Sequence, residues 1–178
     1  CHLPVYHINF LADYSFLIPL FLEEYYNYTG DAQFVKQALI VAEGIFEYFS
    51  QFLNNDKLLQ NIRHMEKVPE EMETILVDWP PNLRDGYDFE KAKKGVCTVV
   101  NMFFYGFAQT TSKLYSIVGD QKRSKEYEAL YTKVGESLIK YTYNSETKLF
   151  VDTTDSTHSA LHSNALQMFF GLTPPDGF

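Results

Sequence analysis

Hydrophobic and polar positions alternate along this chain in two distinct patterns. From Phe10 to about Thr29 the residues are apolar nearly all round, with Pro19 as the main interruption. From Ala32 to about Leu53 the apolar residues follow a three-four spacing, with charged and amide side chains between them. A helix that is apolar all round is buried on most sides, whereas an amphipathic helix shows one face to water. The first segment therefore predicts a buried helix, and the second predicts a surface helix.

Both patterns occur a second time, in the same order. Residues 96–118 are again apolar nearly all round, residues 124–141 are again amphipathic, and a third buried helix is predicted from Ser156 to Phe170. The same short motifs separate the helices: Gly30-Asp31 and Gly119-Asp120 are 89 residues apart, and Lys57-Leu58 corresponds to Lys148-Leu149. Glycine favours the left-handed residue that ends a helix, and aspartate favours the N-cap of the next one.

This internal repeat predicts an all-α fold. Alternating buried and surface helices are typical of two concentric layers, so we predict helical hairpins of an α/α toroid, a partial (α/α)6 barrel. Residues 1–178 would form a single partial domain of roughly two and a half hairpins. Short strands are predicted in the connections, at Leu58–Ile62, Thr74–Val77 and Thr147–Val151, and the stretch Trp79–Lys94 is predicted to be a long loop. The alternative is a plain antiparallel bundle, although bundles favour shorter loops.

Composition and charge narrow the classes of partner. The chain has 178 residues, and its formal net charge of -8 argues against nucleic acid or an anionic membrane as a partner. The longest apolar stretch, Phe10–Leu22, is too short and too polar to span a membrane. The two cysteines, Cys1 and Cys97, form neither a disulfide framework nor a metal motif. We expect Cys97 to be buried as a small hydrophobic side chain.

The long loop carries the densest group of candidate binding residues. Residues 78–88 include the one tryptophan of the chain, Trp79, together with Asp78, Arg84 and Asp85. An aromatic ring can cover the C–H face of a sugar, and Asp and Arg can hydrogen-bond to its hydroxyls. A structural role is equally open: Trp79 could plug the floor of the toroid, and Asp78 or Asp85 could pair with Arg84 or cap a helix.

A second candidate group surrounds two histidines. His158 and His162 are four residues apart, so on the predicted helix they would share one face. Such a pair can hold zinc, but no third ligand is evident, and we expect neither a metal nor another cofactor. The expectation is that one histidine binds a backbone carbonyl or a substrate hydroxyl, while Ser156 or Thr157 caps the helix.

Three stretches, in order along the chain, resemble a known enzyme family. Val77-Asp78-Trp79-Pro80 followed by Arg84-Asp85-Gly86-Tyr87-Asp88 looks like bacterial α-L-rhamnosidases, which are glycoside hydrolases with an (α/α)6 barrel. Tyr28-Thr29-Gly30-Asp31 resembles the turn between an inner and an outer helix of that family. The segment from His158 to Leu166, ending in Phe170-Gly171-Leu172-Thr173-Pro174, resembles the helix after its next hairpin.

The resemblance implies an inverting hydrolysis that uses two carboxyl groups, one as general acid and one to activate water. In that family both groups lie in segments that have no counterpart in this chain, so no catalytic residue is assigned. The resemblance suggests Trp79 as a wall of the sugar pocket with Asp78 beside it; the weaker lining candidates are Arg84, Asp85, His158 and His162. The fragment by itself is expected to be inactive.

Further expectations concern the alternative function, the partners and the compartment. The alternative function is a non-catalytic helical carbohydrate-binding or interaction domain. The expected partner is a carbohydrate, a rhamnoside-like glycan or glycoside, and exposed inner helices are expected to favour self-association of the fragment. The sequence leaves the compartment open, and a periplasmic or secreted parent protein is compatible with the resemblance.

Overall fold

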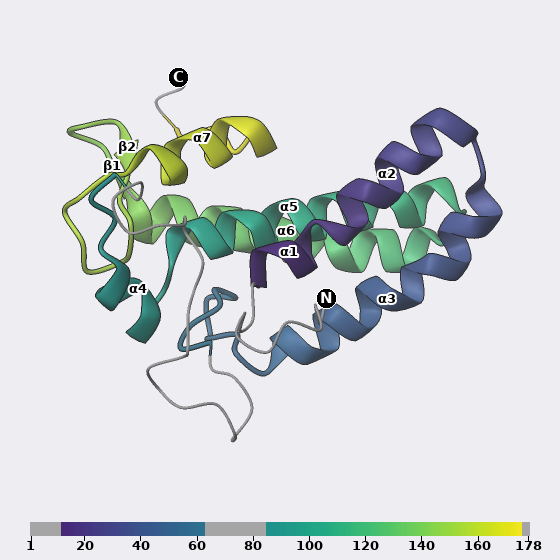
Figure 1. The fold of residues 1–178 in the computed structure, drawn as a ribbon, viewed down its shortest axis with the longest axis horizontal. Helices are drawn as coiled ribbons and strands as arrows, with labels where there is room; N and C mark the ends of the chain where they lie inside the picture. Colours follow the sequence, from purple (N-terminus) through teal and green to yellow (C-terminus); the bar gives the residue numbers. More distant parts are fainter. Residues whose placement is uncertain (1–11, 63–84, 176–178) are drawn as a thin grey trace.

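Helices dominate the computed structural model, which describes residues 12–62 and 85–175 (Figure 1). The elements in chain order are α1 (Ala12–Phe16), α2 (Ile18–Thr29), α3 (Ala32–Ser50), α4 (Phe89–Lys94), α5 (Thr98–Ile117), α6 (Gln121–Thr142), β1 (Tyr143–Asn144), β2 (Leu149–Phe150) and α7 (Leu161–Phe170). The predicted all-α class, with short strands in the connections, is confirmed. The predicted strand Thr74–Val77 lies outside the described residues. The prediction of a loop over Trp79–Lys94 is wrong at its end, because Phe89–Lys94 form the short helix α4. None of the described helices is long and apolar enough to cross a membrane.

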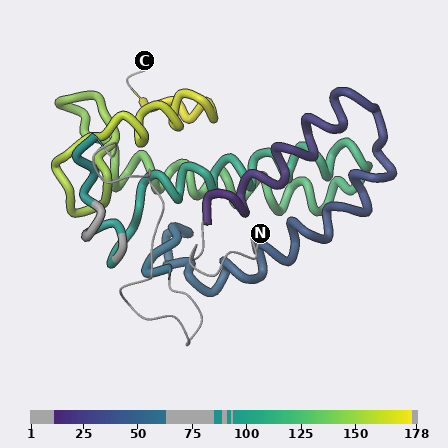
Figure 2. Tube along the Cα trace, viewed as in Figure 1, coloured from purple at the N-terminus to yellow at the C-terminus, as the bar shows by residue number. Residues whose placement is uncertain are grey.

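The helices form two layers, with α5 at the centre of the inner one. Helix α5 packs against α1 and α2 on one flank and against α7 on the other, while α3 and α6 belong to the outer layer (Figures 1 and 2). Helices α2 and α3 form one hairpin, and α5 and α6 form the next. Helix α5 is buried along most of its length, as its all-round apolar pattern predicted. Helix α6 exposes one face, as its amphipathic pattern predicted.

The two Gly-Asp turns have the predicted geometry. Gly30 and Gly119 adopt φ values of 68° and 83°, the left-handed region that a side chain would disfavour. Asp31 then accepts a hydrogen bond from the backbone N–H of Phe34, at 2.9 Å, and Asp120 accepts one from that of Arg123, at 3.0 Å. Each aspartate thus caps the first turn of an outer helix, and local sequence alone sets both turns.

The connections from outer to inner helices also repeat. Lys57 and Lys148 both have a positive φ, 62° and 57°, which marks the tight turn in each connection. After Lys148, strand β2 pairs antiparallel with β1, so the predicted strand at residues 147–151 is confirmed. After Lys57 the predicted strand at residues 58–62 is reduced to one isolated bridge, between Leu53 and Leu59.

The N-terminal helix differs from its prediction. A single buried helix was expected from residue 10 to residue 29, but the described part is divided at Leu17 into α1 and α2. Pro19 explains the division, because its ring clashes with the carbonyl group four residues earlier and it has no N–H to donate. Helix α2 is also not buried on most sides: the exposed fractions of Phe21 and Tyr28 are 60% and 87%. Among the described residues, only α1, α3 and α5 pack closely against it.

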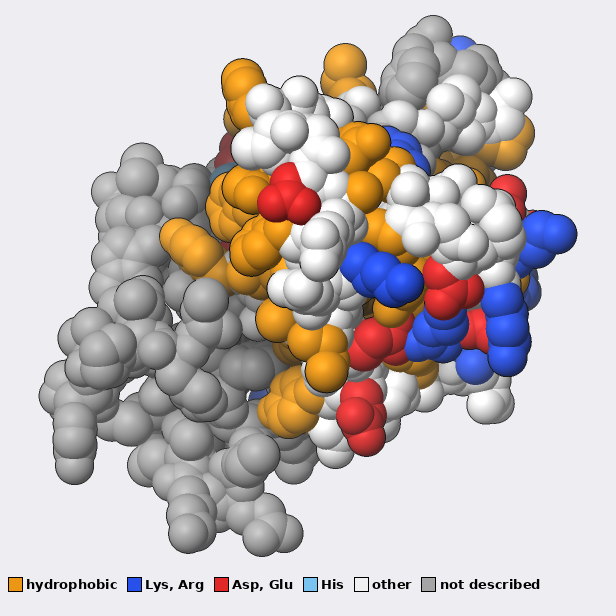
Figure 3. Space-filling model, turned by 90° about the vertical axis from the view of Figure 1, so that its right-hand side faces the viewer, with side chains coloured by type: hydrophobic (Ala, Val, Ile, Leu, Met, Phe, Trp, Pro, Cys, Tyr) orange, Lys and Arg blue, Asp and Glu red, His pale blue; other side chains and the backbone are white. Residues whose placement is uncertain are grey.

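An aromatic cluster joins the two layers. The centroid of the Phe16 ring, in α1, lies 4.5 Å from the ring centroid of Phe49 in α3 and 5.4 Å from that of Phe104 in α5. All three side chains are almost completely buried. Figure 3 views the end of the molecule that carries the Gly-Asp turns, and it shows further hydrophobic side chains at the surface beside a group of charged ones. The hydrophobic core therefore extends from one layer into the other, while further apolar side chains remain exposed at this end of the molecule.

Candidate functional site

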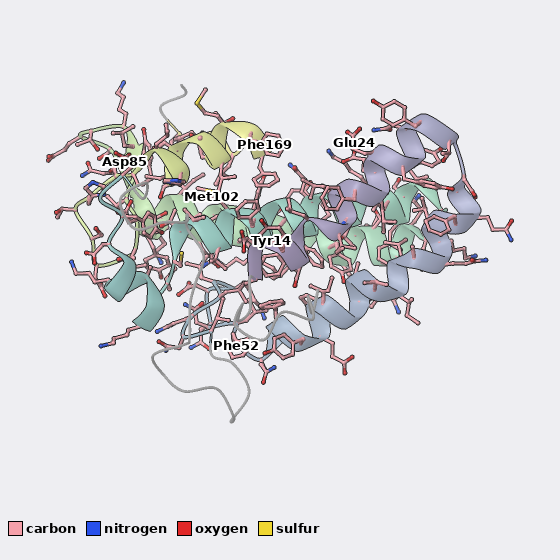
Figure 4. The ribbon with its side chains drawn as sticks, viewed as in Figure 1. Tyr14, Glu24, Phe52, Asp85, Met102 and Phe169 are labelled. Atoms are coloured by element: carbon pink, nitrogen blue, oxygen red, sulfur yellow. The ribbon has the colours of Figure 1, made fainter. Side chains whose placement is uncertain are left out.

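Two connections meet where the inner helices α5 and α7 begin. One is the segment Asp85–Asp88, which precedes α4, and the other is residues 152–160, which precede α7. Figure 4 labels Asp85 in this region, at the end of the molecule opposite the Gly-Asp turns. The two segments are separated by more than sixty residues in sequence, so only the fold brings them together.

Asp152 lies at the centre of this meeting point. Its side chain is completely buried, and its Oδ1 accepts a hydrogen bond from the backbone N–H of Ala160 at 2.8 Å. Its Oδ2 accepts one from the backbone N–H of Asp88, at 3.0 Å, and contacts Nδ1 of His158 at 2.7 Å. A buried carboxylate is costly unless donors compensate for the lost water, and three donors converge on this one. Asp152 therefore organises both segments.

His158 is held with one ring nitrogen inward and its ring partly exposed. Because a carboxylate can only accept, Nδ1 of His158 is the donor in its contact with Asp152, and Nε2 is the ring nitrogen that this contact leaves unused. The side chain is 44% exposed. The ring lies against Gly86, where a Cβ atom would be only 2.9 Å from Nε2. The absence of a side chain at Gly86 is thus needed for the ring to take this position.

Asp85 ties the first segment to α7. Its Oδ2 accepts a hydrogen bond from the backbone N–H of Leu161, the first residue of the helix, at 2.7 Å. The prediction that Asp85 could cap a helix is therefore confirmed, although the helix belongs to a distant part of the chain. Asp85 and Gly86 both have a positive φ, 50° and 71°, so the backbone turns sharply at the point where the Asp85 side chain contacts α7.

The start of α7 corrects three predictions. The helix was expected from residue 156, but it begins at Leu161, and Ala160 before it is extended, with ψ of 157°. The caps are therefore Asp85 and Asp152 rather than Ser156 or Thr157, since their carboxylates bind the N–H groups of residues 160 and 161. Because His158 precedes the helix and His162 lies within it, the two histidines do not share a helical face.

Tyr87 and Cys97 close the base of the site. The Tyr87 hydroxyl donates a hydrogen bond to the backbone oxygen of Asp152, at 2.6 Å, and lies 3.3 Å from Sγ of Cys97. Burial raises the pKa of Tyr87 well above its ordinary value, and burial also raises the pKa of the Cys97 thiol to about 11. Both groups therefore stay protonated near neutral pH. Cys97 is buried, as predicted, and its protonated thiol is a poor nucleophile.

The structure brings together some of the predicted site residues. Asp85 and His158 belong to the same network, through Asp152, Gly86 and the start of α7. His162 is half-buried in the first turn of α7. The other candidates, Asp78, Trp79 and Arg84, lie outside the described residues. Contact of any of these side chains with a sugar stays a prediction.

Asp152, which holds the network together, was missed by sequence reasoning. A signal was present, because Asp152 directly follows the predicted strand Thr147–Val151, and a carboxylate at the end of a buried segment must find donors. Nothing local indicated which donors those would be. Within residues 12–62 and 85–175, no group of three or more His, Cys, Asp and Glu side chains could hold a metal ion.

The geometry suits recognition of hydroxyl groups. The His158 side chain is partly exposed, and a buried carboxylate fixes its Nδ1, so the ring is held in one orientation at the surface. Lys91, at the edge of the same region, donates to the backbone oxygen of Asp155 at 3.2 Å and pairs with Asp88 at 2.9 Å. These contacts hold the two segments in one position, as a preorganised binding surface requires.

Comparisons with known proteins agree with this architecture. Residues 4–177 match the family described as the bacterial alpha-L-rhamnosidase 6 hairpin glycosidase domain. Among solved structures, the chain is similar to a GH78 family rhamnosidase of Bacillus sp. GL1, with a TM-score of 0.73 at 15% sequence identity. The similarity covers 93% of this chain and 16% of that one, and at this identity it shows the fold alone. No curated protein matched.

The predicted fold is confirmed by both comparisons: the two layers of hairpins are part of a six-hairpin helical domain. The resemblance seen in the three sequence stretches is confirmed as well, since the family match extends over almost the whole chain. This chain belongs to the bacterial alpha-L-rhamnosidase six-hairpin glycosidase domain family.

Proposed function

We propose that this chain is part of the catalytic domain of an α-L-rhamnosidase-type glycoside hydrolase and forms one wall of its sugar site. The observation that carries the proposal is the Asp152–His158 pair, which lies where two connections cross the beginnings of α5 and α7. The full-length protein would hydrolyse terminal α-L-rhamnosides with inversion. The chain spans only 16% of the rhamnosidase to which it is similar, so the complete site needs residues beyond it.

Each candidate side chain has a distinct part in this proposal. His158 would exchange a hydrogen bond with a sugar hydroxyl through Nε2, because Nδ1 is held by Asp152. Trp79, with Asp78 beside it, would cover the apolar face of the sugar, as the family resemblance suggests. Arg84, Asp85 and His162 remain weaker lining candidates.

Asp152 is unsuited to the role of general acid or general base. Its carboxylate is completely buried and three donors contact it, so no oxygen is free to reach a glycosidic bond or a water molecule. An inverting enzyme needs two accessible carboxyl groups roughly 6.5–9.5 Å apart, with room for water between them. We place that pair outside this chain and give Asp152 the role of orienting His158.

Calorimetric titration of L-rhamnose tests the binding role. The wild-type chain would be compared with Trp79→Ala and His158→Ala, and Tyr28→Ala would serve as the control because Tyr28 is 87% exposed on α2, beside the Gly-Asp turn. Loss of one hydrogen bond of about 1 kcal/mol should weaken binding about fivefold in His158→Ala. Equal affinities in the wild type and both site variants would contradict the proposal.

A turnover assay separates the enzyme from the alternative, a non-catalytic carbohydrate-binding domain. The full-length protein would be given an aryl α-L-rhamnoside, and the configuration of the released sugar would be followed by NMR. Hydrolysis with inversion supports the glycosidase. Binding of L-rhamnose without any release of the aryl group would support the binding domain instead, because the same wall would then serve recognition alone.

A further inference from the structure

Two inner helices carry an asparagine at the same position of their first turn. Asn101 stands four residues after Cys97, the N-cap of α5, and Asn164 stands four residues after Ala160, the N-cap of α7. Neither residue is part of the network around Asp152. The local sequences differ, so the shared asparagine was not evident as part of the repeat.

Asn101 binds the connection that precedes its own helix. Its Oδ1 accepts a hydrogen bond from the backbone N–H of Leu59 at 2.7 Å, and its Nδ2 donates one to the backbone oxygen of Leu59 at 3.0 Å. The same Nδ2 donates to the oxygen of Cys97 at 2.9 Å. The side chain is completely buried, so all these contacts are shielded from water.

Asn164 makes the same three contacts with the next connection. Its Oδ1 accepts from the backbone N–H of Phe150 at 2.8 Å, and its Nδ2 donates to the oxygen of Phe150 at 3.1 Å and to that of Ala160 at 3.0 Å. Leu59 and Phe150 each stand two residues after a lysine of positive φ, Lys57 and Lys148. Each amide therefore clamps the backbone at the same point of an equivalent connection.

The second clamp lies next to the site. Phe150 is separated from Asp152 by one residue, and Asp152 in turn holds Nδ1 of His158. On its other side this segment is held by Thr98, whose hydroxyl donates to the oxygen of Val151 at 2.7 Å and whose N–H donates to that of Asp152 at 2.9 Å. The segment that carries the Asp152 carboxylate is thus anchored by α5 and by α7, in addition to the hydrogen bonds from the Val151 N–H to the Thr142 oxygen and from Tyr87 to the Asp152 oxygen.

We propose that Asn164 is a positioning residue for the sugar site: by clamping the backbone of Phe150 onto α7, it sets the position from which Asp152 orients His158. This inference rests on the proposed function for its consequence in binding, but the clamp itself is independent of any sugar. The amide of Asn164 combines an acceptor oxygen with a two-proton donor, so it binds both backbone groups of Phe150 and the oxygen of Ala160 at once. Alanine offers neither, and an ionised aspartate lacks the donor.

The test compares Asn164→Ala with Asn144→Ala as a matched control. Asn144 lies in the same β1–β2 connection, and its Oδ1 accepts from the N–H groups of Glu146 and Thr147 at 2.9 and 3.2 Å, away from Asp152. Alanine is the best helix former, so α7 should persist in the first variant, which circular dichroism checks. The readout is the exchange rate of the His158 Nδ1 proton, measured by ¹⁵N-edited NMR.

Asn164→Ala should raise this exchange rate at least about tenfold, as expected from the loss of the two hydrogen bonds that hold Phe150, and should weaken L-rhamnose binding several-fold. Asn144→Ala should change neither quantity. An unchanged exchange rate in Asn164→Ala, or an equal rise in both variants, would overturn the positioning role. If the full-length protein neither binds L-rhamnose nor hydrolyses the aryl rhamnoside, the proposed function fails, and the exchange rates still decide whether Asn164 positions His158.

Discussion

Replacement of Asp13 by asparagine should stabilise this chain at neutral pH. Asp13 lies in α1 with only 9% of its surface exposed, and its Oδ1 has no hydrogen-bond partner among the described residues. Burial raises the pKa of this carboxyl from its ordinary 3.8 to about 6, because the charged form loses water and backbone hydrogen bonds from Asp13 and Tyr14 compensate only in part. At pH 7 the protein therefore folds around a charge that asparagine would remove.

The magnitude follows from the pKa. At roughly 1.4 kcal/mol per pH unit, a rise from 3.8 to about 6 corresponds to about 3 kcal/mol. The sign is set by proton linkage: the folded state holds its proton more tightly, so the wild type loses this stability as the pH rises from about 4 through about 6. The side chain of the Asp13→Asn variant carries no charge at any pH, so the variant should lack this loss.

Urea unfolding measures the difference. Wild type and Asp13→Asn would be unfolded at about pH 4 and at about pH 7.5, with helix content followed by circular dichroism. The two should be similarly stable at the lower pH, and the variant should be more stable by up to about 3 kcal/mol at the higher one. Glu24→Gln is the control, since Glu24 is an exposed carboxyl of α2 (Figure 4).

Two results would refute this reasoning. A constant difference between wild type and Asp13→Asn at both pH values would mean that the carboxyl does not titrate differently in the folded and unfolded states. A variant less stable than the wild type at the higher pH would mean that the Asp13 carboxylate makes a favourable contact that offsets its burial. The control Glu24→Gln should show the same pH dependence as the wild type.

Three other predictions concern packing and the exposed surface. Gly86→Ala should lower the free energy of unfolding by about 1–2 kcal/mol, because the φ of this residue is 71°. It should also weaken L-rhamnose binding, because the added Cβ would contact the His158 ring, and unchanged binding would contradict this. Gly106→Ala should lower the free energy of unfolding, measured with urea, by about 1–3 kcal/mol, because the added Cβ would clash with the Phe170 ring. A variant more stable than the wild type would contradict the packing of α7 on α5. The isolated chain should self-associate through α7 and bind a hydrophobic dye, and Phe169→Lys should reduce both effects. A chain that is monomeric in light scattering and does not bind the dye would contradict this prediction.

The exposed apolar surface that should cause self-association extends over α1, α2 and α7. Large hydrophobic side chains are exposed on both edges of the inner layer. Those with at least half of their surface exposed on α1, α2 and α7 are Tyr14, Phe21, Tyr28, Leu161, Met168 and Phe169. Figure 4 labels Tyr14 and Phe169, which come from the two helices that flank α5. In a six-hairpin domain such edges lie between neighbouring hairpins, so the exposure follows from the fold class.

Much of the fold could be predicted because it depends on short-range signals. The Gly30-Asp31 and Gly119-Asp120 turns need only a residue that tolerates positive φ and a side chain that caps the next helix. The burial of α5 and the one-sided exposure of α6 follow from their hydrophobic spacing. The same spacing was misleading for α2, because a segment can be apolar all round and still lack neighbours within the chain.

The candidate site was less predictable. Asp85 and His158 were selected by residue type, and both belong to the network, but their common partner Asp152 was missed. The start of α7 was placed five residues early, since Ser156 and Thr157 are residue types that cap helices and no local signal delays the first turn to Leu161. The helix begins at Leu161 because carboxylates accept hydrogen bonds from the backbone N–H groups of residues 160 and 161. One of these carboxylates, that of Asp85, lies 76 residues away in the sequence.

The sequence by itself determined the long helices α3, α5 and α6, the order of the hairpins, the two turns and the family. These depend on periodicity and caps, which act within a few residues and are therefore visible along the chain. The tertiary structure alone decided that the segment after Arg84 meets the segment after Val151, that Gly86 makes room for the His158 ring, and that two asparagines clamp equivalent connections. No local pattern along the chain shows which of these segments meet. The packing of the inner helices, and of the connections onto their first turns, brings the residues within contact distance.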